Sequence, residues 1–321
     1  MYRHVNAIRR RYRAILPLLF MAVWAVCPLD GARADLRVTA SIPPVHSLAA
    51  QVMDGAGTPR VLIPAGTSPH GFALAPSQAR MLADAQVVLW IGPRLETALA
   101  KPISTLAEGA RVVALSKAPG LVRHTVRDLD RHDGKIGSGH GHDHAHPAGE
   151  DPHYWLDPEN AKAMLAAIAD ALATADPSRK TLYTGNAAAA QARIDVLTAD
   201  FQGRLARLAK RPFVVFHDAY QYLERRFGLT AAGILAVDPD RPAGTRHIAE
   251  LRLRMTEMNV ACLFTEPQFP SRLAAALIEG TNARIGVLDP LGTGQAAGPG
   301  LYGAMMAANL WAFEDCLGGT P

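Results

Sequence analysis

Short strand-like and helix-like runs alternate along the first half of this chain, and this order constrains the fold more than any other feature. The strand-like runs are rich in β-branched residues and are too short for helices. They lie at residues 36–42, 60–64, 86–92 and 111–116. Helical patterns at 45–55 and 76–85 separate them. Such alternation predicts an α/β fold in which largely parallel sheets are covered by helices.

The same order resumes after residue 210. Strand-like runs lie at residues 211–218, 229–235, 261–267 and 283–290, and helical patterns such as 247–259 and 271–280 lie between them. The second half therefore copies the organisation of the first, although no sequence repeat is evident. We predict two lobes, residues 35–175 and 211–321, each a mainly parallel sheet flanked by helices.

A long helical pattern over residues 176–210 separates the two halves. Asp176 is a suitable capping residue, and Pro177 suits the first helical position. At 1.5 Å per residue, a helix of this length spans roughly 45–50 Å, which is too long for one small lobe. Gly185 and Gly203 weaken the pattern because glycine disfavours helix interiors. We predict one long backbone helix that joins the two lobes.

Residues 119–152 lack both apolar periodicity and aromatic side chains, which predicts a flexible insert in the first lobe. Alternating histidines occupy four positions in the insert: His140, His142, His144 and His146. Imidazoles on a flexible chain would bind a metal weakly, because each binding event must order that chain. We predict an accessory weak metal site here. The alternative is a solvated linker without a function.

Residues 1–34 have the pattern of a secretory signal peptide. A basic region ends near Arg13, an apolar run covers residues 14–26, and the small residues of Ala32-Arg33-Ala34 suggest a cleavage site. The apolar run is short for a membrane span, so we predict export with cleavage rather than a retained anchor helix. Cys27 leaves lipoprotein anchoring as a weaker alternative.

The net charge of +4 comes largely from this N-terminal segment. It holds six of the 33 basic and one of the 29 acidic residues, so residues 35–321 have 27 basic and 28 acidic residues. Their net charge of −1 gives no indication of nucleic acid or an anionic membrane as a partner.

Two cysteines, Cys262 and Cys316, remain after residues 1–34 are removed. An even pair in an exported protein predicts one disulfide. The disulfide would tie the helical pattern at 301–317 to the strand-like run at 261–267, with a stabilisation of roughly 4 kcal/mol for so long a loop. The alternative is two buried free thiols.

Four potential metal ligands lie beside strand ends or a helix start. His70 and His217 follow strand-like runs, as does Asp289, and His153 directly precedes a helical pattern. Ligands of open α/β sheets bind beyond the carboxyl ends of the strands, so these side chains are candidates for one site. Three imidazoles and one carboxylate suit tetrahedral zinc better than manganese. Taken singly, each residue is more often a surface or capping residue than a ligand.

Motifs for other chemistry are missing from the sequence. It has no glycine-rich phosphate loop, no G-x-S-x-G and no H-E-x-x-H. Three histidines and a water also form a catalytic zinc arrangement, so a zinc hydrolase stays an alternative at this point.

Several stretches together resemble the ZnuA-type zinc-binding solute-binding proteins of bacterial ABC transporters, a family of the metal-specific cluster A-I. The resemblance covers nearly all of residues 35–321. It is carried by "TSPHGFALAPSQARMLADAQVVLWIGP", "DPHYWLDPENA", "VFHDAYQYLERRFGL", "TEPQF" and "VLDPLGTG", together with the His-rich insert and the closing "DCLGG".

The resemblance implies two lobes joined by a rigid helix, with the metal between them. The family's ligand histidines match His70, His153 and His217, and manganese-type relatives tend to carry Glu at the last of these positions. Some zinc-binding members have Glu just before the first histidine, where this chain has Pro69. Asp289 matches a carboxylate ligand of other members, and a water would complete the coordination if Asp289 does not.

The resemblance also implies supporting residues and a function. Glu266 and Asp157 would orient the ligand imidazoles, or else simply end a strand and cap a helix. The protein would capture Zn(II) in the periplasm with high affinity and deliver it to an inner-membrane ABC permease. We expect it to act as a monomer and to catalyse no reaction. The alternatives are a manganese or iron solute-binding protein, a periplasmic zinc buffer and a zinc hydrolase.

Overall fold

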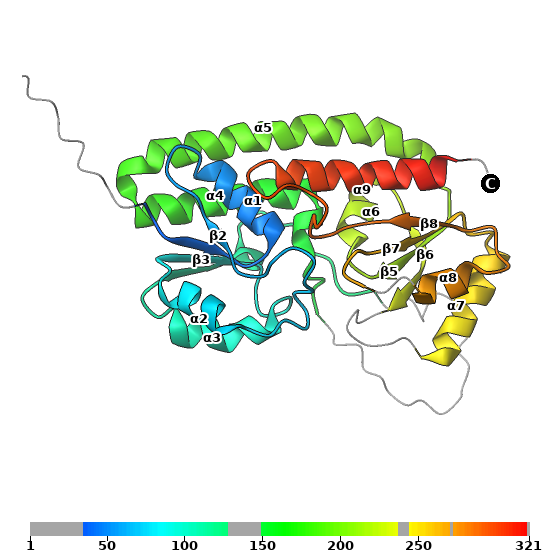
Figure 1. Ribbon diagram of the computed structural model, residues 1–321. Coiled ribbons are helices and arrows are strands. Elements are labelled where there is room, and N and C mark those ends of the chain that lie inside the picture. The colour runs from blue at the N-terminus through cyan, green and yellow to red at the C-terminus, as the bar shows by residue number, and fades with distance from the viewer. Residues whose placement is uncertain (1–34, 128–148, 237–243, 270–271, 320–321) are drawn as a thin grey trace, which may run out of the picture. The chain divides into compact units, whose positions relative to one another are not determined.

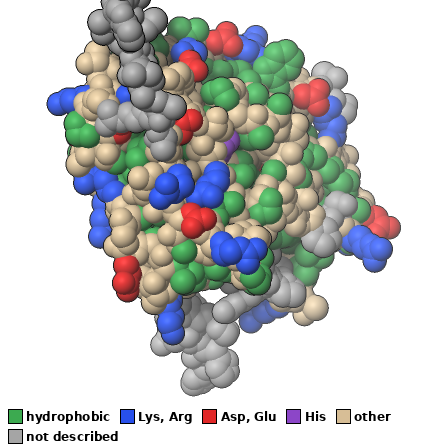
Figure 2. All heavy atoms as spheres, turned by 60° about the vertical axis from the view of Figure 1, so that its left-hand side comes forward, with side chains coloured by type: hydrophobic (Ala, Val, Ile, Leu, Met, Phe, Trp, Pro, Cys, Tyr) green, Lys and Arg blue, Asp and Glu red, His purple; other side chains and the backbone are tan. Residues whose placement is uncertain are grey.

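The computed structural model describes residues 35–127, 149–236, 244–269 and 272–319 (Figure 1). The predicted signal peptide and the four alternating histidines lie outside these residues. Among the residues described, no helix has the length and apolar character needed to cross a membrane. Charged side chains of both signs are scattered among apolar ones on the face shown in Figure 2, which fits the low net charge of residues 35–321.

Two four-stranded sheets form the centres of two lobes, and every strand pair is parallel. The first sheet, in the order β2-β1-β3-β4, comprises β1 (Val38–Ala40), β2 (Arg60–Val61), β3 (Val87–Trp90) and β4 (Arg111–Ala114). The second, in the order β6-β5-β7-β8, comprises β5 (Phe213–His217), β6 (Ala231–Ala236), β7 (Cys262–Thr265) and β8 (Arg284–Val287). The second lobe thus repeats the strand order of the first. The predicted α/β fold class is confirmed.

Helices cover both sheets (Figure 1). The first lobe contains α1 (Pro43–Val52), α2 (Pro76–Ala83), α3 (Ala100–Leu106) and α4 (Pro158–Ala175), and the second contains α6 (Gln221–Phe227), α7 (Thr245–Glu257) and α8 (Arg272–Ile278). The last helix is α9 (Leu301–Gly318). Short 3-10 turns lie at Thr97–Leu99, Leu115–Lys117, Tyr154–Leu156, Pro177–Arg179 and Ala206–Leu208. Proline stands in the first turn of α1, α2 and α4, where its missing N–H leaves no hydrogen bond unmade.

The long helix between the lobes is α5 (Lys180–Leu205), with a 3-10 turn at each end. Its 26 residues span about 39 Å, somewhat less than the sequence pattern indicated. Gly185 and Gly203 are exposed and do not interrupt it. The helix packs on α1 and α4 of the first lobe and on α9 (Figure 1). Helix α9 in turn packs on both β8 and α1, so it also belongs to both lobes.

One hydrophobic core extends through both lobes. It includes Leu48 of α1, Leu165 of α4, Phe201 of α5, Phe264 of β7 and Phe313 of α9. Because the same core contains residues of both sheets, the lobes share buried apolar surface instead of meeting only through a linker. This continuity holds the facing ends of the two sheets at a set spacing.

A second, smaller core lies on the other face of the second sheet, beneath α7 and α8. Strand β5 separates the two cores because successive side chains of a strand point to opposite faces. Phe213 and Val215 belong to the main core, whereas Val214 and Phe216 belong to the smaller one. The strand is therefore buried on both faces and holds His217 at its end on a rigid support.

The predicted disulfide is present between Cys262 of β7 and Cys316 of α9. It closes a loop with a sequence separation of 54 residues, for which the chain-entropy model gives a stabilisation of roughly 4 kcal/mol. It ties the sheet of the second lobe to the helix that packs against both lobes.

Replacing both exposed glycines of α5 by alanine should stabilise the protein. A Cβ at Gly185 or Gly203 would meet nothing within 4 Å. Alanine should therefore add about 0.5–1 kcal/mol at each site, because it restricts the unfolded chain more than glycine does. Chemical denaturation measures this gain. Gly233→Ala is the matched control, since its Cβ would lie 2.5 Å from Leu251 Cδ1 and should destabilise. A loss of stability from the α5 substitutions would contradict the prediction.

Candidate metal centre

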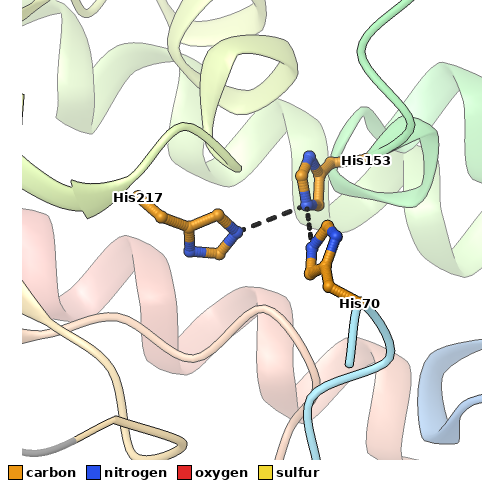
Figure 3. A group of neighbouring side chains, drawn as sticks. All are labelled: His70, His153 and His217. Atoms are coloured by element: carbon orange, nitrogen blue, oxygen red, sulfur yellow. Dashed lines mark hydrogen bonds between the residues drawn. The ribbon is translucent and has the colours of Figure 1, made fainter. Parts of the chain in front are cut away.

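Three histidine side chains from separate segments point toward one another (Figure 3). His70 lies in the loop between β2 and α2, His153 directly precedes the turn Tyr154–Leu156, and His217 ends β5. His153 Nε2 lies 3.3 Å from His70 Nε2 and 3.3 Å from His217 Nε2. One ring nitrogen from each of the three histidines lies within 4.8 Å of the other two. His153 and His217 are buried, and His70 is partly exposed.

The distances between these nitrogens suit a tetrahedral zinc site. With Zn–N bonds of about 2.0–2.1 Å, two ligand nitrogens at a tetrahedral angle lie about 3.3–3.4 Å apart. Both distances that involve His153 have this value. Two of the three separations among these nitrogens therefore match those of ligands on one tetrahedral zinc ion.

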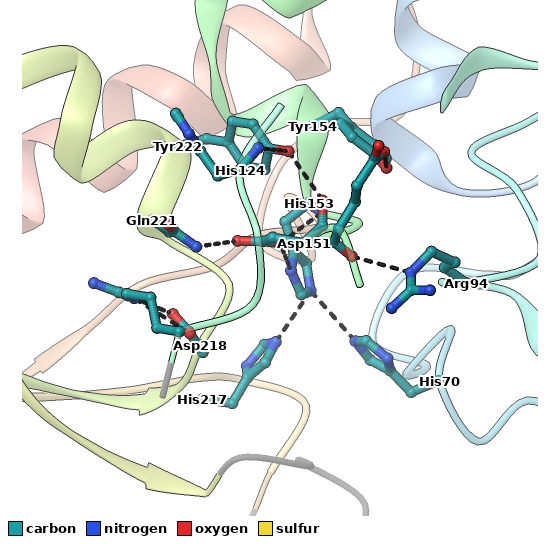
Figure 4. A network of polar contacts seen from close by, with 12 residues as sticks. His70, Arg94, His124, Asp151, His153, Tyr154, His217, Asp218, Gln221 and Tyr222 are labelled. Atoms are coloured by element: carbon teal, nitrogen blue, oxygen red, sulfur yellow. Dashed lines mark hydrogen bonds and ion pairs between the residues drawn. The ribbon is translucent and has the colours of Figure 1, made fainter. Parts of the chain in front are cut away.

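Carboxylates orient two of the three imidazoles, and Figure 4 shows the carboxylate of Asp151 beside His153. His153 Nδ1 lies 2.8 Å from Asp151 Oδ1, and His217 Nδ1 lies 2.6 Å from Glu266 Oε1. A carboxylate only accepts hydrogen bonds, so each Nδ1 carries the proton and donates it. In the neutral ring each Nε2 then carries a lone pair. Two lone pairs facing each other at 3.3 Å repel, and a cation between them relieves this repulsion.

The imidazoles differ in their tendency to protonate. Burial and the neighbouring imidazoles lower the pKa of His70 well below 6.5. Burial and the charge of His217 do the same to the pKa of His153. Burial also lowers the pKa of His217, but the charge and hydrogen bond of Glu266, together with the charges of Asp218 and Asp151, outweigh burial, and this pKa is raised overall. The lowered pKa values of His70 and His153 favour the neutral form that metal binding requires, and the raised pKa of His217 makes it the imidazole at which protons compete most with a metal.

Asp151 is the supporting residue that the sequence reasoning missed. Its buried carboxylate accepts hydrogen bonds from the backbone N–H and Nδ1 of His153 and from Gln221 Nε2. Burial raises the pKa of this carboxyl to about 6. A signal was present in "DPH", where an acid stands two residues before a ligand.

The expected role of Asp157 needs correction. Its Oδ1 accepts a hydrogen bond from Glu159 N and thereby caps α4. Both of its oxygens also accept from Arg226 at 2.8 Å. The carboxylate therefore bonds the N-terminus of α4 and the guanidinium of Arg226. Asp157 thus caps a helix, which was the alternative to orienting an imidazole. Of the two expected supporting residues, only Glu266 contacts a ligand imidazole.

The structure does not bring Asp289 into the group of converging ligand atoms. Its Oδ1 accepts hydrogen bonds from the backbone N–H groups of Leu291 and Gly292 and from Gln268 Nε2. Its Oδ2 faces the N–H of Gly294. The carboxylate shapes the turn after β8 and is held there by these donors. A fourth ligand from Asp289, as the sequence led us to expect, is therefore not supported by this geometry.

The two ends of the insert, at residues 124–127 and 149–151, meet beside the site. Thr125 and Glu150 form an antiparallel bridge, and Asp151 N donates to His124 O. Arg127 forms ion pairs with Asp218, next to His217, and with Glu224 of α6. The insert therefore leaves and re-enters the described structure close to the three histidines, and Arg127 ties this part of the first lobe to the second.

Apolar side chains wall the pocket into which the histidines point. Its lining includes Pro69, Phe269, Pro290 and Leu291. A wall of this kind limits water access and strengthens electrostatic interactions inside the pocket.

Comparisons with known proteins agree with this fold. The family model of the periplasmic component A of zinc-uptake complexes matches residues 38–316. The high-affinity zinc uptake system protein ZnuA of Brucella abortus (strain 2308) is 37% identical over 341 aligned residues, which cover 97% of this chain and 99% of that protein.

Solved structures share the fold. A zinc-bound ZnuA deletion mutant superposes with a TM-score of 0.75 at 22% identity, covering 90% of this chain and 100% of that one. A manganese-bound periplasmic metal-binding protein from Candidatus Liberibacter asiaticus gives a TM-score of 0.72 at 20% identity, covering 88% and 100%. The fold alone therefore does not select the metal. By its match to the family model and to full-length relatives, the chain belongs to the family of periplasmic zinc-uptake complex components A.

Proposed function

We propose that this chain is a solute-binding protein that binds one zinc ion tightly through His70, His153 and His217. The observation that carries the proposal is the pair of 3.3 Å distances from His153 Nε2 to the Nε2 atoms of His70 and His217. Carboxylates fix the direction of the Nε2 lone pairs of His153 and His217. The function named for the Brucella abortus relative, high-affinity zinc uptake, supports the same role here. The bound ion is the cargo of the protein.

Zinc is favoured over manganese by the chemistry of the ligands. Three neutral imidazoles form an all-nitrogen set, whereas manganese prefers more oxygen. Pro69 offers no side-chain donor, and Asp289 is engaged in its own turn. The fourth position of a tetrahedral zinc would then be filled by a water.

The remaining parts of the proposal concern location and partners. Residues 1–34 act as a signal peptide that directs the chain to the periplasm, where it works as a monomer. It catalyses no reaction and releases zinc to an ABC permease in the inner membrane. Membership of a periplasmic zinc-uptake family supports this assignment.

Removal of a ligand imidazole should abolish tight zinc binding. Loss of a residue that only orients a metal ligand lowers metal affinity about 10- to 100-fold. We expect His70→Ala and His217→Ala, which remove a ligand itself, to weaken zinc affinity by more than this. Competition with a fluorescent zinc chelator measures the change. His247→Ala is the control, because that imidazole contacts Ile234 O and lies outside the ligand group. Unchanged affinity in both ligand variants would refute the zinc site.

Asparagine substitutions at Asp151 and Asp157 should have different effects, the first on zinc affinity and the second on the stability of the fold. Asp151→Asn should weaken zinc binding about 10- to 100-fold, because His153 loses its charged acceptor. Asp157→Asn should leave affinity within about threefold, but should cost about 1–3 kcal/mol of stability through the weakened Arg226 contacts. Calorimetric zinc titration and chemical denaturation measure the two effects. Equal losses of affinity would contradict this division.

We further propose that His140, His142, His144 and His146 form an accessory weak zinc site. A protein lacking residues 128–148 should keep one tight site and lose only weaker, rapidly exchanging ions. The full chain and the deletion variant are compared by zinc titration, with Arg127 and Gly149 retained so that the flanks can still pair. Loss of the tight site in the deletion variant, or an unchanged number of bound ions, would count against an accessory role.

A further inference from the structure

Gln268 is a polar residue of the metal pocket that the ligand set does not use. It lies in the segment just after β7, within "TEPQF", and lines the same pocket as His70, His153 and His217. Most other side chains that wall this pocket, such as Phe269 and Leu291, are apolar. A primary amide among them can accept or donate hydrogen bonds toward whatever occupies the pocket.

The orientation of the Gln268 amide is set by its neighbours. Its Nε2 donates to Asp289 Oδ1 at 2.9 Å and to Thr293 Oγ1 at 3.0 Å. A carboxylate cannot donate, so the nitrogen must be the atom that faces Asp289. The two N–H groups are thereby used, and the amide oxygen Oε1 is left as an acceptor.

This oxygen is buried and has no hydrogen-bond partner among the described residues. A buried acceptor without a donor is unfavourable, because folding removes the water that donated to it and supplies no other hydrogen bond. Asp289 receives four donors through Oδ1, Gln268 Nε2 among them, and so holds the amide in this orientation at that cost. A group that enters the pocket and donates to Oε1 would recover the loss.

We infer that Gln268 Oε1 accepts a hydrogen bond from the water that is the fourth ligand of the bound zinc. This inference rests on the proposed zinc-binding function. A water on zinc is strongly polarised and donates charge-assisted hydrogen bonds. Asp289 then acts on the ion only through Gln268, as a positioning residue. An amide at this place completes the site without adding a negative charge, which keeps the coordination suited to zinc and unattractive to manganese.

Gln268→Met tests the inference, because methionine has a similar length and no hydrogen-bonding oxygen. We expect zinc affinity to fall about 10- to 100-fold. We also expect a change in the visible absorption bands of the Co(II)-loaded protein, because these report the ligand sphere. Gln191→Met on α5, where Nε2 donates to Lys162 O, is the matched control and should match the unsubstituted protein in both readouts. Thermal unfolding of the metal-free proteins checks that the fold is retained.

The outcomes separate the inference from the function on which it rests. If His70→Ala loses zinc while Gln268→Met keeps the affinity and the Co(II) spectrum of the unsubstituted protein, the role of Gln268 is refuted and the zinc site stands. If His70→Ala also binds zinc normally, the proposed function itself fails. Should Gln268→Met not fold, Gln268→Asn withdraws the amide by one methylene, and an unchanged Co(II) spectrum in that variant would likewise refute the inference.

Discussion

Hydrogen bonds from imidazole Nδ1 to buried carboxylates are the interactions on which the site depends. Asp151 performs this role in the first lobe and Glu266 in the second. Each carboxylate fixes one tautomer and turns one Nε2 lone pair toward the other. The result is a pair of nitrogens whose mutual repulsion a metal ion removes. The site thus has a geometry ready for a cation and an electrostatic reason to bind one.

That geometry holds only if the lobes keep their spacing, and the core explains why they do. Helices α5 and α9 contact both lobes, and the main hydrophobic core continues from one sheet to the other. The disulfide at Cys316 secures α9 to β7, and Arg127 forms ion pairs across the lobes beside His217. Packed cores resist continuous deformation, so these contacts favour a site whose ligands move little as zinc enters.

Much of the fold could be predicted from local patterns. Each of the eight strand-like runs coincides with a strand, to within one residue, and the helical patterns lie on helices, because burial and periodicity are properties of neighbouring residues. The long helix was predicted too, although its ends tighten into 3-10 turns that apolar periodicity does not reveal. His70 and His217 were candidate ligands because they follow strands, where ligands of open α/β sheets bind. The meeting of these residues with His153 joins two separate sheets, and no local pattern predicts it.

The sequence by itself determined the fold class and the pairing of Cys262 with Cys316, because each follows from residue type and spacing. Only the tertiary structure decided which carboxylates serve the imidazoles. From the sequence, Asp157 and Asp289 were as plausible as Asp151 for a place in the metal site. Asp157 instead bonds a guanidinium, and Asp289 bonds backbone N–H groups. A side-chain oxygen bonds the donors that lie nearest in space, and residues far apart in the chain supply several of those donors.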